Sequence, residues 1–420
     1  MKDFLLDSLL HLKSYGSLLK DIEEKTTPIA VHGLMEENLG HFSAALNLHL
    51  GKQLLLVTYD ELRSRQLYED IKSIAGEAST VHFPRKELLF YDIDAHSHER
   101  THQRLKAVSR LFESRDTIVI ASIEAIGDRI LSRKTLETHR ISLSLGEEHL
   151  LDVITDKLIA SGYERVSMVE AQGQFSLRGG ILDVFSPDME NPARIEFFDT
   201  MVDSIRSFDF RTQRSLEVLD SITIYPSRDL LIPRDGTLVA EAISRDLASY
   251  LKASSEKQSR ELAEEKFGKY IELLKQGIHI PNRDILLPYL GTEMISDILD
   301  HLREDAVILL DEPRRIREAK ISLENSFDSW ASELFQAGEV LKSHFHSRIR
   351  LQDFIDNTGK FTCLTSAAFL KQDHDFPPKS IHQLPGRQMT VYHGKLDLLK
   401  EDLERFKYKG YKTIILSGTE

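Results

Sequence analysis

The chain has 420 residues, of which 41% are hydrophobic and 29% are charged, and its formal net charge at pH 7 is −13. This composition is typical of a globular protein with room for about two to four domains. No apolar run approaches the roughly 20 residues that cross a bilayer, and residues 1–15 lack the basic leader and small-residue cleavage site of a signal peptide. The acidic total argues against a large DNA-binding channel formed by these residues alone, because such a channel needs cations to neutralise phosphates.

The first 134 residues alternate between strand and helix patterns. Short apolar runs predict strands at residues 28–32, 53–58 and 117–121, with amphipathic helices between them. This alternation predicts a parallel sheet with helices on both faces, and therefore an α/β fold. A further buried strand is expected at 306–310. We therefore assign residues 1–134 and 211–350 to two parts of one α/β domain.

Between these parts, residues 135–210 carry a different pattern. Short strands are expected at 174–177, 181–185 and 194–198, separated by the turn signals Arg178-Gly179-Gly180 and Ser186-Pro187-Asp188. A helix is expected at 147–161. The segment is therefore predicted to be a β-rich α+β domain inserted into the α/β domain.

The C-terminal residues read as a connection followed by a new domain. Residues 351–377 precede several prolines and are expected to be a linker. Residues 378–420 contain one helix pattern at 395–406 and one strand pattern at 412–416. Because one helix and one or two strands cannot close a core, we expect these residues to be the start of a third, truncated α/β domain.

The first strand-to-helix turn, at Gly33, is where a phosphate-binding loop would stand. A working loop reads GxxxxGK[ST], because backbone N–H groups, a lysine and a hydroxyl must share the phosphates and Mg²⁺. Here the run 32–38 reads HGLMEEN, without lysine or hydroxyl and with two glutamates beside the phosphate position. Asp311 and Glu312 resemble the Walker-B pair that holds Mg²⁺, the alternative being an acidic turn before Pro313. Together these residues predict a degenerate P-loop (RecA-like) domain that has lost its nucleotide chemistry.

Two other motifs carry little chemistry. Residues 98–102 read HERTH and match the HExxH helix of zinc proteases, but Arg100 and Arg104 would bring positive charge close to the metal. Cys363 is the only cysteine, which excludes an intrachain disulfide and suits a reducing cytoplasm, and no particular histidine is implicated beside it. No Ser-His-Asp arrangement can be argued. We expect no catalytic residue, no metal site and no cofactor in this chain.

The remaining candidates suggest recognition. Arg165, Phe175 and Arg178 place two arginines and an aromatic residue around the hairpin of the β-rich domain. These residue types are the commonest at interface hot spots, because they supply bidentate bonds and rigid apolar area. The alternative is that Phe175 belongs to the core and that both arginines only solubilise a strand edge.

The sequence of the β-rich domain resembles the insert shared by the excision-repair protein UvrB and the bacterial transcription-repair coupling factors. The resemblance is carried by the runs YER at 163–165, LRGG at 177–180, IEFFD at 195–199, VDSIR at 202–206 and QRS at 213–215. UvrB keeps a phosphate loop and a long aromatic β-hairpin. This chain lacks the loop, and residues 89–95 leave no room for the hairpin. The chain is therefore identified as a member of the coupling-factor family, similar to its N-terminal UvrB-homology module.

This resemblance implies a division of labour. In the family, the β-rich insert recruits UvrA, and the matching positions here are Arg165, Phe175 and Arg178. The resemblance also implies later domains that bind RNA polymerase and translocate on double-stranded DNA with ATP and Mg, in a cytoplasmic protein. Two alternatives stay open: a UvrB-like ATP-dependent damage-verification protein, and a structural autoinhibitory module.

Overall fold

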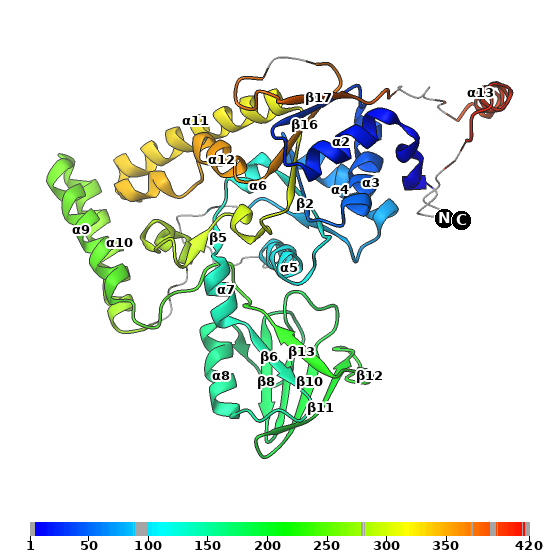
Figure 1. Cartoon of the computed structure of the whole chain (residues 1–420). Helices are drawn as coiled ribbons and strands as arrows, with labels where there is room; N and C mark the ends of the chain where they lie inside the picture. Colours follow the sequence, from blue (N-terminus) through cyan, green and yellow to red (C-terminus); the bar gives the residue numbers. More distant parts are fainter. Residues whose placement is uncertain are drawn as a thin grey trace.

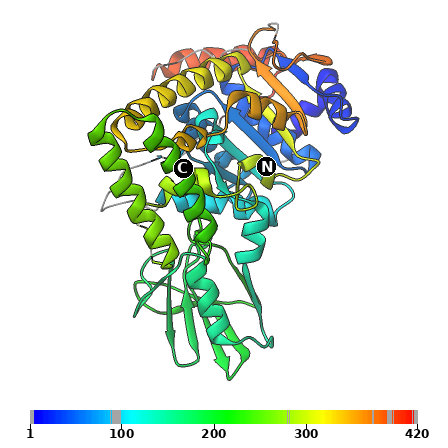
Figure 2. The same ribbon diagram turned by 90° about the vertical axis from the view of Figure 1, so that its left-hand side faces the viewer.

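The structure is a computed structural model that describes residues 5–86, 88, 99–278, 280, 282–370, 373–386, 392, 394–413 and 415. Three units are visible in Figure 1: an α/β domain around a large sheet, a helical unit beside it, and a β-rich unit. Figure 2 shows from a second direction that the β-rich unit projects away from the α/β domain. No helix among the described residues is long and apolar enough to cross a membrane.

The α/β domain is built on a seven-stranded sheet in which every neighbouring pair is parallel. The strand order is β17-β1-β16-β15-β2-β4-β3. The strands are β1 (Ile29–His32), β2 (Leu54–Thr58), β3 (Thr80–Phe83), β4 (Ile118–Ser122), β15 (Val307–Asp311), β16 (Thr362–Ala367) and β17 (Ser380–Gln383). The mixed α/β class expected from the sequence is confirmed, together with a parallel sheet.

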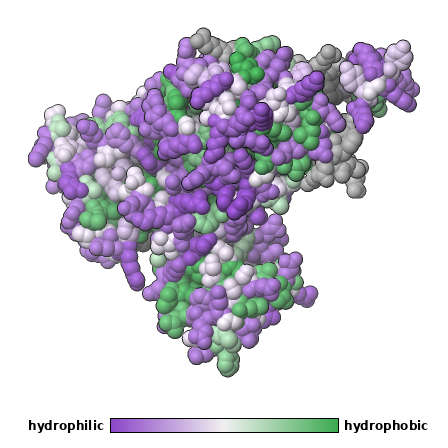
Figure 3. Space-filling view, viewed as in Figure 1, coloured by the Kyte–Doolittle hydropathy of each residue, from purple (hydrophilic) through white to green (hydrophobic). Residues whose placement is uncertain are grey.

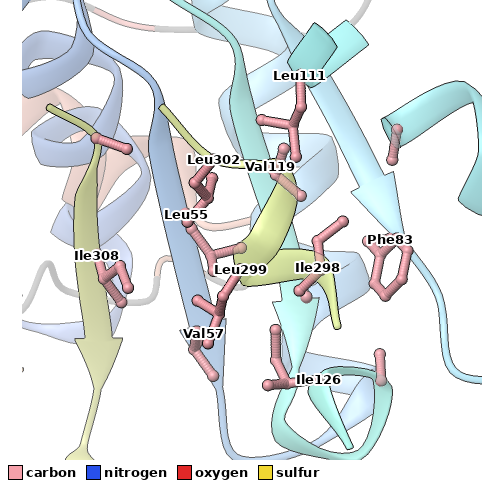
Figure 4. Close-up of a cluster of buried hydrophobic side chains, with 14 of the residues drawn as sticks. Leu55, Val57, Phe83, Leu111, Val119, Ile126, Ile298, Leu299, Leu302 and Ile308 are labelled. Carbon is pink, nitrogen blue, oxygen red and sulfur yellow. The ribbon is translucent and has the colours of Figure 1, made fainter. Parts of the chain in front are cut away.

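Helices cover both faces of this sheet, so successive side chains of one strand enter different cores. Leu54 and Leu56 face the helices α2 (Lys13–Glu23), α3 (Leu39–Leu50) and α4 (Glu61–Ala75). Leu55 and Val57 face the opposite core with α5 (Glu99–Glu113), α6 (Ile123–Ile126), α11 (Pro313–Ala337) and α12 (Leu351–Thr358). In this second core they meet the short helix η4 (Ile298–His301), as the close-up in Figure 4 shows. Burial on both faces explains why these strands read as continuous apolar runs.

The prediction of a linker at residues 351–377 is wrong. These residues form α12 and β16, and β16 lies inside the sheet between β1 and β15. The segment after residue 378 first forms β17, which pairs with β1 as an edge strand of the same sheet. Among the described residues after β17, α13 (Leu396–Tyr408) has no buried residue and stands apart from the sheet. The strand expected at 412–416 is not formed at residues 412, 413 and 415, and its other positions lie outside the described residues.

The β-rich unit contains a six-stranded sheet in the order β12-β11-β10-β9-β8-β7. Its strands are β7 (Glu164–Arg165), β8 (Gln174–Arg178), β9 (Ile181–Val184), β10 (Ala193–Phe198), β11 (Met201–Phe208) and β12 (Ser215–Val218). One face packs against α8 (Leu151–Ala160) and the pair β6 (Ile141–Ser144) and β13 (Ser221–Ile224). The three predicted strands are present as β8, β9 and β10. The unit extends beyond the expected limit of residue 210, because β12 and β13 belong to it.

The helical unit packs α9 (Thr237–Ala253) and α10 (Lys257–Lys275) against η3 (Arg283–Tyr289), η5 (Lys342–His346) and the C-terminal half of α11. The remaining short elements are η1 (Asp7–His11), η2 (Glu36–Asn38), β5 (Ile130–Leu131), α7 (Arg133–His139) and β14 (Ile295–Ser296).

A cluster of buried charges joins the three units. Lys86 of the α/β domain contacts Asp229, just after the β-rich unit, at 3.3 Å and Asp284 of the helical unit at 2.7 Å. The side chain of Arg104 in α5 is fully buried and lies 3.6 Å from Asp128 and 3.7 Å from Asp229. A buried ion that loses its partner is strongly destabilising. The cluster therefore fixes the segment that leaves the β-rich unit after β13 against both neighbours.

Candidate vacated nucleotide site and docking face

Gly33 ends β1 at the carboxyl edge of the parallel sheet, and its surroundings are filled by the chain itself. Gly33 has φ of +89°. Its carbonyl accepts a 2.8 Å hydrogen bond from the N–H of Gly386. A Cβ placed on Gly33 would lie 2.6 Å from the carbonyl oxygen of Leu384, and one on Gly386 would lie 2.4 Å from Oδ1 of Asn38. Residues 384–386 therefore lie against the turn that would have to cradle phosphates.

Asp311 ends β15 in the Walker-B position and is paired with a protein cation. Nε of Arg63 donates to Oδ2 of Asp311 at 3.0 Å, with the two side chains 9% and 7% exposed. Arg63 also donates to the carbonyl oxygen of Glu36 at 3.0 Å. Desolvation raises the pKa of the Asp311 carboxyl, while the charge of Arg63 opposes that rise. The guanidinium thus supplies the counter-charge that Mg²⁺ would supply in a working site.

Glu312 is also engaged by the surrounding backbone. It adopts φ of +56°, and its Oε1 accepts a 3.0 Å hydrogen bond from the N–H of Ala368. A cavity beside Glu312 and His32 has a volume of about 30 Å³, whereas ligand pockets enclose roughly 300 Å³ or more. At this place the carboxyl edge of the sheet offers a nucleotide little room, and the Arg63 cation is already paired with Asp311.

The HExxH match and Cys363 are the other two motifs that the sequence analysis considers. Among the described residues, no group of three or more His, Cys, Asp or Glu side chains is arranged to hold a metal ion. His98 of the HExxH match lies outside the described residues, and Glu99 begins α5. Cys363 is buried in β16, where desolvation raises the pKa of its thiol well above the ordinary range. A thiol held protonated in this way is a poor nucleophile.

The docking face expected from the sequence lies on the sheet of the β-rich unit, and its residues alternate between two sides. Phe175, Leu182, Ile195 and Phe197 point into the core shared with α8. Residues one position away point to the opposite side, which we call the outer face. Arg178 lies on this face, because Leu177 pairs with Leu182 on the core side. Loop residues cover part of the outer face: Oγ of Ser176 donates to the carbonyl of Ser167 at 3.1 Å, and Nη2 of Arg194 donates to Oε1 of Gln213 at 3.2 Å.

Arg178 is held in place on the outer face by a buried carboxylate. Nη2 of Arg178 donates to Oδ2 of Asp183 at 2.9 Å, and the Arg178 side chain is 55% exposed while that of Asp183 is 2% exposed. Arg194 binds the same carboxylate: its Nε donates to Oδ1 at 2.7 Å and its Nη2 donates to Oδ2 at 2.8 Å. These hydrogen bonds raise the pKa of Arg194. Two guanidinium groups therefore share one carboxylate, which orients Arg178 and leaves one positive charge in excess.

Phe175 is the clear correction to the predicted site. It is 0% exposed and belongs to the core that α8 and the sheet enclose. A side chain in that position stabilises the unit and cannot touch a partner. The alternative interpretation, in which Phe175 is core, holds for this residue.

Arg165 is exposed in β7, but it does not share a side of the sheet with Arg178. Its register partner is Phe175, so strand geometry directs its side chain to the same side as Phe175. The structure therefore brings together Arg178, Asp183 and Arg194, and leaves Arg165 at the sheet edge. An exposed aromatic that the sequence analysis did not single out is Phe198, which is 74% exposed. Its neighbour Phe197 is buried, and this alternation was the available signal.

Comparison with known proteins agrees with this geometry. Residues 141–230 match the family model of the UvrB interaction domain, and the chain is thus an α/β protein that carries such a domain. Over 97% of its length it is 30% identical to the transcription-repair-coupling factor of Bacillus subtilis (strain 168), of which it covers 34%. Over 88% of its length it is 28% identical to that of Staphylococcus aureus (strain bovine RF122 / ET3-1), of which it covers 31%. The chain is therefore a homologue of transcription-repair-coupling factors that spans about a third of their length, and the resemblance drawn from the sequence is confirmed.

Proposed function

We propose that this chain is the N-terminal module of a transcription-repair coupling factor and that it recruits UvrA to RNA polymerase stalled at DNA lesions. The observation that carries the proposal is the outer face of residues 174–206. It belongs to the region matched as a UvrB interaction domain, is covered by no helix among the described residues, and presents Arg178 in a fixed orientation. A preoriented arginine loses little side-chain entropy on binding, which favours a role as an interface anchor.

The module itself is proposed to be catalytically silent and to use no cofactor. This part of the proposal is supported by the Arg63–Asp311 pair and by the packing of residues 384–386 against Gly33. Placing a triphosphate there would require it to displace both a buried cation and a segment of chain. ATP with Mg, RNA polymerase and double-stranded DNA are proposed partners of the remainder of a longer, ATP-dependent DNA translocase, which acts in the cytoplasm.

The test of recruitment is a binding titration between this chain and UvrA of the same organism. Arg178→Ala should weaken binding about tenfold or more, because it removes a charged contact at a desolvated interface. Arg214→Ala is the matched control, since Arg214 is exposed in the same unit, in the connection between β11 and β12. Equal affinity of the unchanged chain and Arg178→Ala would remove the assignment of the outer face.

A separate titration addresses the UvrB-like alternative. Isothermal calorimetry with ATP and Mg²⁺ should show no binding heat, because residues 384–386 lie against the turn at Gly33 and the cavity beside Glu312 is only about 30 Å³. Saturable nucleotide binding that Asp311→Asn removes would instead support an ATP-dependent role for this module.

A further inference from the structure

The outer face carries an exposed apolar tip at one end of the sheet. The tip consists of Phe198, Ile181 and Met201, whose residues are 74%, 37% and 39% exposed. An aromatic side chain with this exposure presents most of its apolar area to water, and such residues mark contact sites when they cluster. The space-filling view in Figure 3 shows hydrophobic side chains on the surface of the β-rich unit.

The strand register places these three residues together and on the side of Arg178. Phe198 is paired with Met201 across the β10–β11 hairpin, and Ile181 is paired with Arg178 across the β8–β9 hairpin. The N–H of Phe197 donates to the carbonyl of Gly180 at 2.8 Å, which joins the two hairpins at their ends. Directly paired residues share a side of the sheet, so the tip and Arg178 belong to one surface.

Gly179 and Gly180 form a tight turn without side chains, so the turn leaves the apolar tip exposed. Gly179 adopts φ of +61°, and a Cβ on Gly180 would lie 2.7 Å from the carbonyl oxygen of Phe197. A two-residue turn of this kind brings β10 close to the turn between β8 and β9. Phe198 therefore extends past the turn and is not covered by it.

The charges beside the tip indicate what kind of surface it fits. Arg178 and Arg194 share the carboxylate of Asp183, and Glu196, which is paired with Ile181, is bonded to Arg206. Within these contacts three guanidinium groups face two carboxylates, so one positive charge is in excess. A complementary partner needs an apolar pocket for the aromatic ring and carboxylates at its rim.

We propose that Phe198, flanked by Ile181 and Met201, is the aromatic anchor with which this face enters an acid-rimmed apolar pocket of UvrA. The inference rests on the proposed function and adds to it the residue that supplies the apolar contact. Phe198 thus takes the role that the sequence analysis gives to Phe175, and Arg178 is the charged contact beside it.

The test titrates UvrA against the unchanged chain, Phe198→Ala and two controls of similar exposure. Val218→Ala changes an 83% exposed residue at the far edge of the same sheet, and Phe369→Ala changes a 71% exposed aromatic of the α/β domain. We expect Phe198→Ala to raise the Kd about tenfold or more, Phe198→Leu to recover part of the loss, and both controls to stay within about twofold. Thermal melts of all variants should coincide, because the altered side chains are exposed.

The outcomes separate this inference from the function on which it rests. If the unchanged chain does not bind UvrA, the proposed function fails and the anchor fails with it. If Arg178→Ala weakens binding while Phe198→Ala does not, recruitment stands and the anchor is refuted. If Phe198→Ala instead abolishes self-association of the chain and leaves UvrA affinity unchanged, the tip serves a second copy and the proposal is overturned.

Discussion

The ion pair between Arg63 and Asp311 can be broken by one substitution, and the consequence follows from its burial. Arg63→Met keeps most of the side-chain length but removes the cation that lies 3.0 Å from a carboxylate only 7% exposed. Removing one partner of a buried ion pair destabilises a protein by about 3–5 kcal/mol, because the remaining charge is uncompensated. The hydrogen bond from Arg63 to the carbonyl of Glu36 is lost as well. We therefore expect a loss of about 3 kcal/mol or more near neutral pH.

The pH dependence of this loss distinguishes a buried charge from general damage. Desolvation already raises the folded-state pKa of Asp311, and without Arg63 that pKa rises further. A carboxyl whose folded pKa exceeds its unfolded value is stabilising when protonated, and this stabilisation is lost as pH rises through the folded pKa. The difference between Arg63→Met and the unchanged chain should therefore shrink as the pH is lowered.

The assay is urea unfolding monitored by the fluorescence of Trp330, the single tryptophan of the chain. Trp330 lies in α11, the helix that follows the strand ending at Asp311. Arg65→Met is the matched control, since Arg65 is exposed two residues further along the same helix. Asp311→Leu combined with Arg63→Met should restore most of the stability, because no buried charge remains. The reasoning is refuted if Arg63→Met and Arg65→Met differ by less than about 1 kcal/mol, or if their difference grows in acid.

Three further predictions concern other positions in the fold. Desolvation lowers the pKa of both His301 and His344 to about 4. As pH falls below about 6.5 the unfolded state therefore takes up protons first, and each histidine should remove up to about 3 kcal/mol of stability by pH 4. Urea unfolding at several pH values measures this loss, and equal stability at pH 7 and pH 5 would contradict it. Phe175→Ala should destabilise the β-rich unit by about 3–5 kcal/mol. When the UvrA titration is analysed with the concentration of folded chain alone, the Kd of Phe175→Ala should equal that of the unchanged chain. Gly386→Val should destabilise residues 380–386 by about 1–3 kcal/mol because of its close approach to Asn38, which faster hydrogen exchange at the amides of β17 would show.

The sequence was informative for the sheet where burial alone decides the pattern. The run LLLVT of β2 and the run VILLD of β15 are buried at every position, so their continuous apolar character predicts central strands. In contrast, β16 reads TCLTSA and is also almost wholly buried. It is a central strand because β1 and β15 pair with its backbone on both sides. That pairing is a property of the tertiary fold, and local sequence cannot reveal it.

The docking residues show the same limit at the level of single side chains. Arg178 could be predicted as exposed, because arginine is rarely buried. Whether Phe175 or Phe198 faces the partner depends on which side of the sheet receives α8, and that choice is made by tertiary packing. Because the side chains of a strand alternate, burying Phe197 beside Ile195 leaves Phe198 on the outer face. A resemblance at the level of motifs therefore predicts a surface, and the choice of Phe198 as its proposed anchor depends on tertiary packing.

If the proposed loss of a nucleotide site is correct, two contacts at the carboxyl edge of the sheet fix that loss in the structure. A carboxylate at the end of β15 without Mg²⁺ is a buried uncompensated charge, and Arg63 relieves it. Phosphates accept hydrogen bonds from the backbone N–H groups of such a turn, and here the N–H of Gly33 donates to the carbonyls of Ala367 and Ala368, both at 3.2 Å. Arg63 takes the place of the Mg²⁺ charge, and residues 384–386 take up the space that the phosphates would need. Restoring a lysine in the loop would therefore not restore nucleotide binding, because the cation and the chain segment that took the ligand's place would both remain.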